Sequence, residues 1–109
     1  MPRAGWRLAF AAALVGIFVI ALLPTGMGEP LFPQVDKFQH AMAFGALWIL
    51  GARAGCRPGW ALGAGLLAYG VAIELAQGLT SYRDASAADV MADLAGMALA
   101  AWWLRRPTT

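Results

Sequence analysis

The sequence predicts an all-α membrane protein: a single domain over residues 1–109 that folds as a four-helix transmembrane bundle. Two observations support this prediction. Hydrophobic residues make up 61% of the chain and charged residues only 13%, whereas a soluble domain has about 45–50% and about 25%. Apolar segments of near-membrane length also follow one another between charges and prolines, at residues 8–23, 37–52, 60–79 and 87–104.

The six prolines all lie outside these segments. An internal proline would remove a backbone hydrogen bond that lipid cannot replace, so their placement favours continuous helices. The first two segments are short for a full span, which indicates little tilt or a locally thinned membrane.

The first segment, residues 8–23, follows Arg3 and Arg7 and so has the beginning of a secretory signal peptide. It continues into Leu-Leu-Pro-Thr-Gly, which lacks the small-residue pattern of a cleavage site. We therefore expect a retained transmembrane helix.

Basic residues predict the orientation of the bundle, because Lys and Arg accumulate in cytoplasmic loops. We predict that both termini are cytoplasmic. In that orientation only two basic residues, Lys37 and Arg83, lie on the external side. The cytoplasmic side then carries the other six basic residues: Arg3, Arg7, Arg53, Arg57, Arg105 and Arg106. Four tryptophans lie near the same side, as an interfacial aromatic belt requires: Trp6, Trp60, Trp102 and Trp103.

The second segment opens with the run Asp36-Lys37-Phe38-Gln39-His40. Asp36 and His40 are four residues apart, so on a helix they lie on one face. Asp36 has a plainer interpretation as a helix N-cap, with Gln39 completing a capping box. For His40 the plainer interpretation is a hydrogen bond to a neighbouring helix.

The third and fourth segments carry acids within apolar sequence. Glu74 and Gln77 are three residues apart and share a helix face in the third segment. Asp89 and Asp93, four residues apart, share a face in the fourth, where Asp89 also fits a capping box with Ser86. No cap explains Glu74 or Asp93. A charge at the centre of a span costs about 2.5–3.5 kcal/mol, so these two acids indicate a site or a structural network.

Successive helices alternate in direction, so the outer ends of the second, third and fourth segments meet at one level of the membrane. We expect their polar side chains to converge there, with Arg83 in the connecting loop placed to bridge the carboxylates. The candidate polar pocket consists of Asp36, Lys37, His40, Glu74, Gln77, Arg83, Asp89 and Asp93.

Several functional classes lack their motifs. The chain contains no HExxH, CxxC, GxxxxGK[ST] or GxSxG. Its one histidine and one cysteine cannot supply a zinc site of several His and Cys ligands. A hard cation held by carboxylates stays open, and the sequence identifies no cofactor. The basic residues are scattered, which argues against a nucleic-acid partner.

The order and spacing of the polar residues over about residues 30–100 resemble the VanZ-like family of small bacterial membrane proteins. The resemblance is carried by Asp36-Lys37-x-x-His40-x-x-x-Phe44, Glu74-x-x-Gln77, Arg83 and Asp89-x-x-x-Asp93-x-x-Gly96. It implies a multi-pass protein of the bacterial cytoplasmic membrane with a cell-envelope role, in a family named for a protein linked to teicoplanin resistance. The family usually has Asn at the position of Asp93, so this chain places an additional acid in the site.

We expect the pocket to bind a membrane lipid, a cell-wall precursor or an amphiphilic, glycopeptide-type antibiotic in the outer leaflet, with Lys37 and Arg83 contacting an anionic headgroup. One alternative is a metal-assisted hydrolase or transferase acting on a lipid phosphate, with His40 as general base paired with Asp36. Another is a structural membrane subunit without a ligand, so whether the chain is an enzyme is left open. Four short helices bury little surface alone, which favours homo-oligomers or association with partners.

Overall fold

The chain folds into four α-helices in a computed structural model that describes residues 2–23, 34–56, 59–80 and 87–105, with residues 34–36 described by their backbone alone. The helices are α1 Arg3–Ala21, α2 Gln34–Arg53, α3 Trp60–Gly78 and α4 Ala87–Arg105. No strand occurs among the described residues. The all-helical fold expected from the sequence is therefore present. α1 starts five residues earlier than the apolar segment, because Arg3 and Arg7 continue the helix beyond its hydrophobic part.

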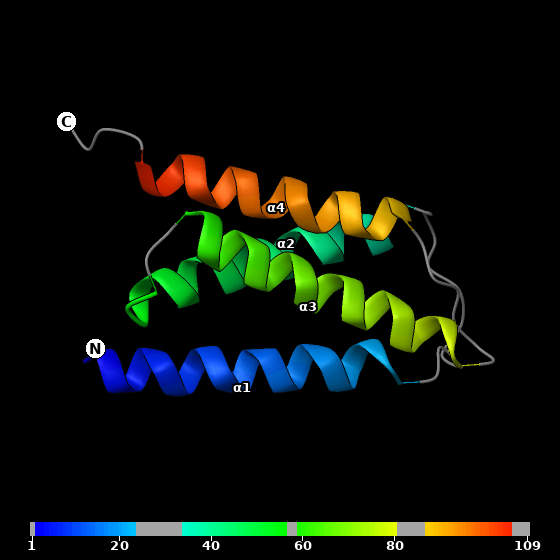
Figure 1. Cartoon of the computed structure of the whole chain (residues 1–109), viewed down its shortest axis with the longest axis horizontal. Coiled ribbons are helices and arrows are strands. Elements are labelled where there is room, and N and C mark those ends of the chain that lie inside the picture. The colour runs from blue at the N-terminus through cyan, green and yellow to red at the C-terminus, as the bar shows by residue number, and fades with distance from the viewer. Residues whose placement is uncertain (1, 24–33, 57–58, 81–86, 106–109) are drawn as a thin grey trace.

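The helices lie side by side along the long axis of a molecule measuring 45 × 27 × 23 Å (Figure 1). The start of α1 and the end of α4 lie at the same end of the bundle (Figure 1). α2 packs most extensively on α4, whereas α1 packs mainly on α2 along the edge. α2 is therefore the element around which the other three are arranged.

A close backbone contact sets the α2–α4 pairing. A Cβ atom added to Gly96 would lie 2.0 Å from the carbonyl oxygen of Ala41, and one added to Gly45 would lie 3.2 Å from the carbonyl oxygen of Gly96. Only glycine at position 96 permits this approach, as is common where membrane helices pack tightly.

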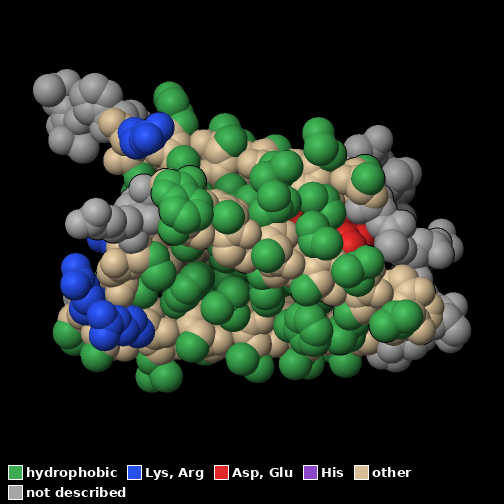
Figure 2. Space-filling view, in the orientation of Figure 1, with side chains coloured by type: hydrophobic (Ala, Val, Ile, Leu, Met, Phe, Trp, Pro, Cys, Tyr) green, Lys and Arg blue, Asp and Glu red, His purple; other side chains and the backbone are tan. Residues whose placement is uncertain are grey.

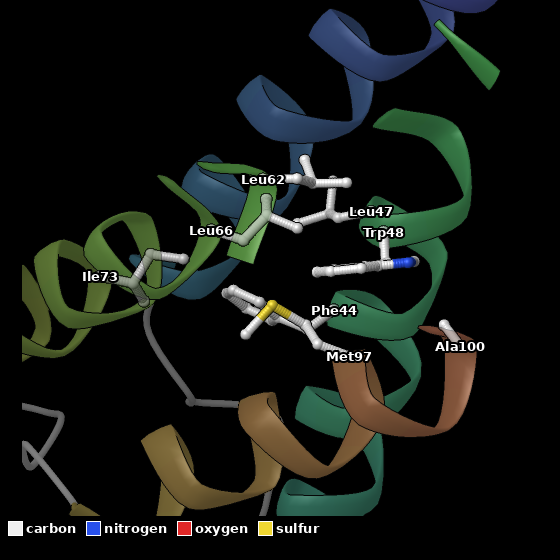
Figure 3. Packing of buried hydrophobic residues seen from close by; sticks show 8 residues of the cluster. All are labelled: Phe44, Leu47, Trp48, Leu62, Leu66, Ile73, Met97 and Ala100. Carbon is white, nitrogen blue, oxygen red and sulfur yellow. The ribbon is translucent and has the colours of Figure 1, made fainter. Parts of the chain in front are cut away.

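The hydrophobic core joins α2, α3 and α4 and leaves α1 outside (Figure 3). Phe44 and Leu47 of α2 and Ile73 of α3 are almost fully buried, with exposed fractions of 1%, 0% and 2%. α1 has no buried residue and contributes partly buried side chains such as Leu14 and Phe18. The first helix is thus a peripheral element attached to a three-helix core.

The outer surface is apolar along most of the bundle (Figure 2). Large hydrophobic side chains such as Leu8, Leu75 and Trp60 are 73%, 66% and 86% exposed. Among the described helices, α1, α3 and α4 are long and apolar enough to cross a membrane. α2 is more polar, because its first turns carry Gln34, Lys37, Gln39 and His40 in the sequence.

Charges are separated along the bundle axis. Lys and Arg side chains gather at the end where α1 starts and α4 ends, and acidic side chains show toward the opposite end (Figure 2). At the basic end, Arg7 donates a hydrogen bond from Nε to the Ala54 carbonyl oxygen (3.2 Å), and the Arg53 guanidinium lies over the Trp6 ring. Among the described residues, Arg3, Arg7, Arg53 and Arg105 therefore lie at the end where the sequence predicts basic residues.

Candidate functional site

His40 is the centre of a polar cluster, defined here as Lys37, His40, Glu74, Asp89 and Asp93. Its Nδ1 atom lies 2.8 Å from Oδ1 of Asp93, which is a hydrogen bond. Its Nε2 atom lies 3.6 Å from Oδ2 of Asp89 and 4.0 Å from Oε1 of Glu74. Asp93 thus fixes one ring nitrogen of the imidazole, and the other nitrogen is directed at two carboxylates from two different helices.

The three carboxylates of the polar cluster are removed from solvent. Glu74 and Asp89 are 5% exposed and Asp93 is 1% exposed. Burying ionised carboxylates is costly unless opposite charges or hydrogen bonds compensate them. Lys37 compensates Asp89, because its Nζ lies 2.6 Å from Oδ1 of that residue. Even with His40 protonated, the polar cluster carries one formal negative charge more than it carries positive charges.

Helical spacing and two glycines bring these groups together. Asp89, Asp93 and Gly96 lie on one stripe of α4, and the close contact of Gly96 with α2 presses this stripe against His40. On α3, a Cβ added to Gly70 would lie 2.7 Å from Oδ2 of Asp93. The missing side chain of Gly70 therefore makes room for the Asp93 carboxylate.

The structure brings together five of the eight residues expected in the candidate pocket. The prediction that Glu74, Asp89 and Asp93 converge on His40 is met by the distances given above. Arg83 lies outside the described residues, and so does the side chain of Asp36. The predictions that Arg83 bridges the carboxylates and that Asp36 pairs with His40 therefore stay predictions.

Gln77 makes a contact that was not expected from the sequence. Its Nε2 donates a hydrogen bond of 2.8 Å to the carbonyl oxygen of Ala21, the last residue of α1. The last carbonyl groups of a helix lack partners within that helix, and an amide donor from α3 satisfies this one. Gln77 thus ties the end of α1 to α3, on the same side of the bundle as the polar cluster.

A hollow, called here the lateral cavity, opens between α1, α2 and α3 beside the polar cluster. Its volume is about 300 Å³. Most of its wall is apolar, and Gln39, His40 and Gln77 supply the polar part. The complete lining is Ile17, Ile20, Ala21, Gln39, His40, Ala43, Phe44, Ile73 and Gln77. His40 therefore belongs to both the lateral cavity and the polar cluster.

The α1 side of the lateral cavity was not expected from the sequence, because Ile17 and Ile20 look like ordinary lipid-facing residues. A second link between α1 and α3 was also missed: the Tyr69 hydroxyl donates a hydrogen bond to the carbonyl oxygen of Leu14. A tyrosine in the middle of an apolar segment is the signal that could have indicated it, because a buried hydroxyl requires a partner.

Three residues of the polar cluster can offer ligand atoms to one cation. The nearest donor atoms of His40, Glu74 and Asp89 all lie within 4.8 Å of one another. Imidazole nitrogen and carboxylate oxygen are both common ligands of divalent metals in proteins. The arrangement can therefore bind a cation, or it can act as a hydrogen-bonded network that joins three helices.

The chain matches no protein-family model, no curated protein and no solved structure in comparisons with known proteins. The VanZ-like resemblance therefore depends on the polar residues of the sequence. An assignment of function has to be argued from the site itself.

Proposed function

We propose that the chain is a VanZ-like multi-pass protein of the bacterial cytoplasmic membrane that binds an amphiphile of the cell envelope in the lateral cavity. The ligand class is a membrane lipid, a cell-wall precursor or a glycopeptide-type antibiotic. The observation that carries the proposal is that His40 lines an apolar cavity and also belongs to a buried charged cluster. Sites for small molecules are mostly apolar with a few polar groups that fix orientation.

The two parts of the site suit the two parts of an amphiphile. Ile17, Ile20 and Phe44 provide an apolar wall for an acyl chain, and His40 and Gln77 provide polar contacts for the adjoining headgroup. A volume of about 300 Å³ lies at the lower end of the range for small-molecule pockets. The lateral cavity therefore accommodates part of an acyl chain and its linkage rather than a whole lipid or antibiotic.

Charge distribution supports an outer-leaflet location. The start of α1 and the ends of α2 and α4 place Arg3, Arg7, Arg53 and Arg105 at one end of the bundle, and the polar cluster lies toward the opposite end (Figure 1). Basic residues accumulate on the cytoplasmic side of bacterial membrane proteins. With the basic end in the cytoplasm, the ligand reaches the lateral cavity from the outer leaflet.

A second candidate function is hydrolysis or transfer at a lipid phosphate with the help of a metal ion. It is favoured by the proximity of the donor atoms of His40, Glu74 and Asp89. In that case His40 binds metal and is held by Asp93, which differs from the general-base role paired with Asp36 that the sequence suggests. Turnover of a phospholipid that stops on chelation would favour this function over binding alone.

The test is teicoplanin susceptibility of a sensitive bacterial host that expresses the wild type, Glu74→Gln, Asp93→Asn or Leu75→Ala at matched membrane levels. We expect the wild type and Leu75→Ala to raise the inhibitory concentration, because Leu75 is 66% exposed on the outer surface. We expect Glu74→Gln to abolish protection. Equal susceptibility with the wild type and an empty vector would refute the antibiotic as ligand, and equal protection by Glu74→Gln would refute the polar cluster as its site.

A further inference from the structure

The arrangement around His40 is the one that histidine adopts when it binds a metal. A metal-binding histidine uses one ring nitrogen as ligand and usually donates the other N–H to a carboxylate, which fixes the tautomer and the ring orientation. Here Asp93 accepts from Nδ1 at 2.8 Å, which leaves Nε2 as the nitrogen that faces Glu74 and Asp89. Asp93 is 1% exposed, so the orienting carboxylate is itself held by the core.

The distances from His40 Nε2 to the two carboxylates are too long for hydrogen bonds. They are closer to the distance between two ligands of the same metal ion. Nε2 of His40 lies 3.6 Å from Asp89 and 4.0 Å from Glu74, and both distances exceed the usual hydrogen-bond range of about 2.7–3.2 Å. With metal–ligand distances of about 2.0–2.2 Å, neighbouring ligands of tetrahedral zinc lie roughly 3.3 Å apart. The donor atoms of His40, Glu74 and Asp89 all lie within 4.8 Å of one another, so a bound ion would draw them closer together.

The charges of the polar cluster also favour a cation. Lys37 contacts Oδ1 of Asp89, whereas Oδ2 of the same carboxylate faces His40, so the lysine and a metal ion can share this residue. Glu74 and Asp93 add two further buried carboxylates from two helices. With His40 neutral as a ligand and the three carboxylates ionised, these five residues carry two more negative than positive charges, which a divalent cation would balance.

We propose that His40 Nε2, Glu74 and Asp89 bind a divalent transition-metal ion of the zinc class, with Asp93 as the residue that positions His40. The mixture of imidazole and carboxylate ligands favours such a metal over Mg²⁺ or Ca²⁺, which prefer oxygen ligands alone. Three protein ligands leave a coordination position for water or for an anionic headgroup. The inference deepens the proposed function, because the ion would provide the contact for a phosphate at the edge of the lateral cavity.

The first experiment measures Zn²⁺ binding to the full chain, purified in detergent without a histidine tag and stripped with a chelator. We expect one zinc ion per chain by isothermal titration calorimetry and by metal analysis after gel filtration. Glu74→Gln and Asp89→Asn should each weaken binding at least tenfold, and Asp93→Ala, which removes the acceptor for the His40 N–H, should weaken it by about 10- to 100-fold, as changes of a carboxylate behind a metal-bound histidine do. Leu75→Ala, next to Glu74 in α3 but exposed on the outer surface and outside the ligand set, should bind zinc like the wild type.

A spectroscopic measurement on the wild type keeps the test independent of variant folding. X-ray absorption at the zinc edge should show nitrogen and oxygen ligands only. A sulfur ligand would implicate Cys56 and overturn the assignment, as would undiminished binding by Glu74→Gln or the absence of stoichiometric zinc in the wild type. Zinc binding without an effect on teicoplanin susceptibility would support the metal site and refute only the antibiotic as ligand. Protection against teicoplanin without zinc binding would refute the metal site.

Discussion

Asp93 is the most deeply buried charged side chain among the described residues, with 1% of its surface exposed. It accepts a hydrogen bond from Nδ1 of His40 and occupies the space left by Gly70. An asparagine at this position could also accept this hydrogen bond through its side-chain carbonyl. The acid therefore adds a charge beside His40 that orienting the ring does not require.

Two substitutions of Asp93 separate orientation from charge. We expect Asp93→Asn to change the free energy of unfolding by less than about 1 kcal/mol, because the acceptor for His40 is retained and a buried charge is removed. Asp93→Ala should lower it by about 2–3 kcal/mol, because a buried hydrogen-bond partner is lost. Denaturant titration in detergent micelles measures both changes. Equal destabilisation by the two variants would show that the charge itself stabilises the fold.

At the scale of the helix, the packing of α2 on α4 depends on Gly96, whose Cβ would lie 2.0 Å from the carbonyl oxygen of Ala41. We expect Gly96→Ala to separate the two helices, to lower the melting temperature by several degrees and to weaken zinc binding. Gly65→Ala is the matched control, because a Cβ at that position meets no atom within 4 Å. It should be neutral or stabilise α3 by up to about 1 kcal/mol, since alanine is the better helix former. Similar losses in both variants would contradict the close-packing role of Gly96.

α1 is attached to α3 by two side-chain hydrogen bonds to its backbone. The Tyr69 hydroxyl donates to the Leu14 carbonyl oxygen, and the Gln77 amide donates to the Ala21 carbonyl oxygen. These bonds matter because α1 has no buried residue of its own.

We expect the double variant Tyr69→Phe/Gln77→Leu to loosen α1 without unfolding the other helices. A lost hydrogen bond with a buried acceptor costs about 1–3 kcal/mol. Hydrogen exchange measured by mass spectrometry should show faster exchange in the C-terminal half of α1 and unchanged exchange in α4. Leu75→Ala, on the exposed face of α3, is the control. Faster exchange throughout the chain would instead indicate that α1 is part of one cooperative core.

At the scale of the whole molecule, the single cysteine tests the orientation in the membrane. Cys56 is exposed and follows α2 at the basic end of the bundle. With that end in the cytoplasm, a membrane-impermeant maleimide should leave Cys56 unlabelled in intact spheroplasts and label it after lysis. In the double variant Cys56→Ser/Glu29→Cys, the thiol lies in the first loop that is predicted to be external. The maleimide should label this variant in intact spheroplasts, before lysis. The reverse pattern would invert the topology.

Features of the fold that depend on neighbouring residues in the sequence could be predicted, whereas features that depend on contacts between helices could not. Apolar length and proline placement are local, and they predict four helices close to the observed ones, although Arg3 and Arg7 were placed outside the first helix. The spacing of Glu74, Asp89 and Asp93 on helix faces predicts their convergence. Their partners were less predictable, because the Asp93–His40 hydrogen bond depends on the depth to which α4 approaches α2. The role of Gln77 likewise depends on where α1 ends in space.

For the membrane protein proposed above, the order of the helices along the chain has a consequence for insertion. α2 carries Lys37 and His40, and it leaves the ribosome before α3 and α4 bring the three acids. Each acid placed in hydrocarbon without a partner would cost up to about 2.5–3.5 kcal/mol. Because the two cationic partners are synthesised first, two of the three carboxylates can be neutralised as they arrive. Insertion of α3 and α4 is thus more favourable when α2 is already in the membrane. If α2 fails to insert, the acids of α3 and α4 enter the hydrocarbon without cationic partners.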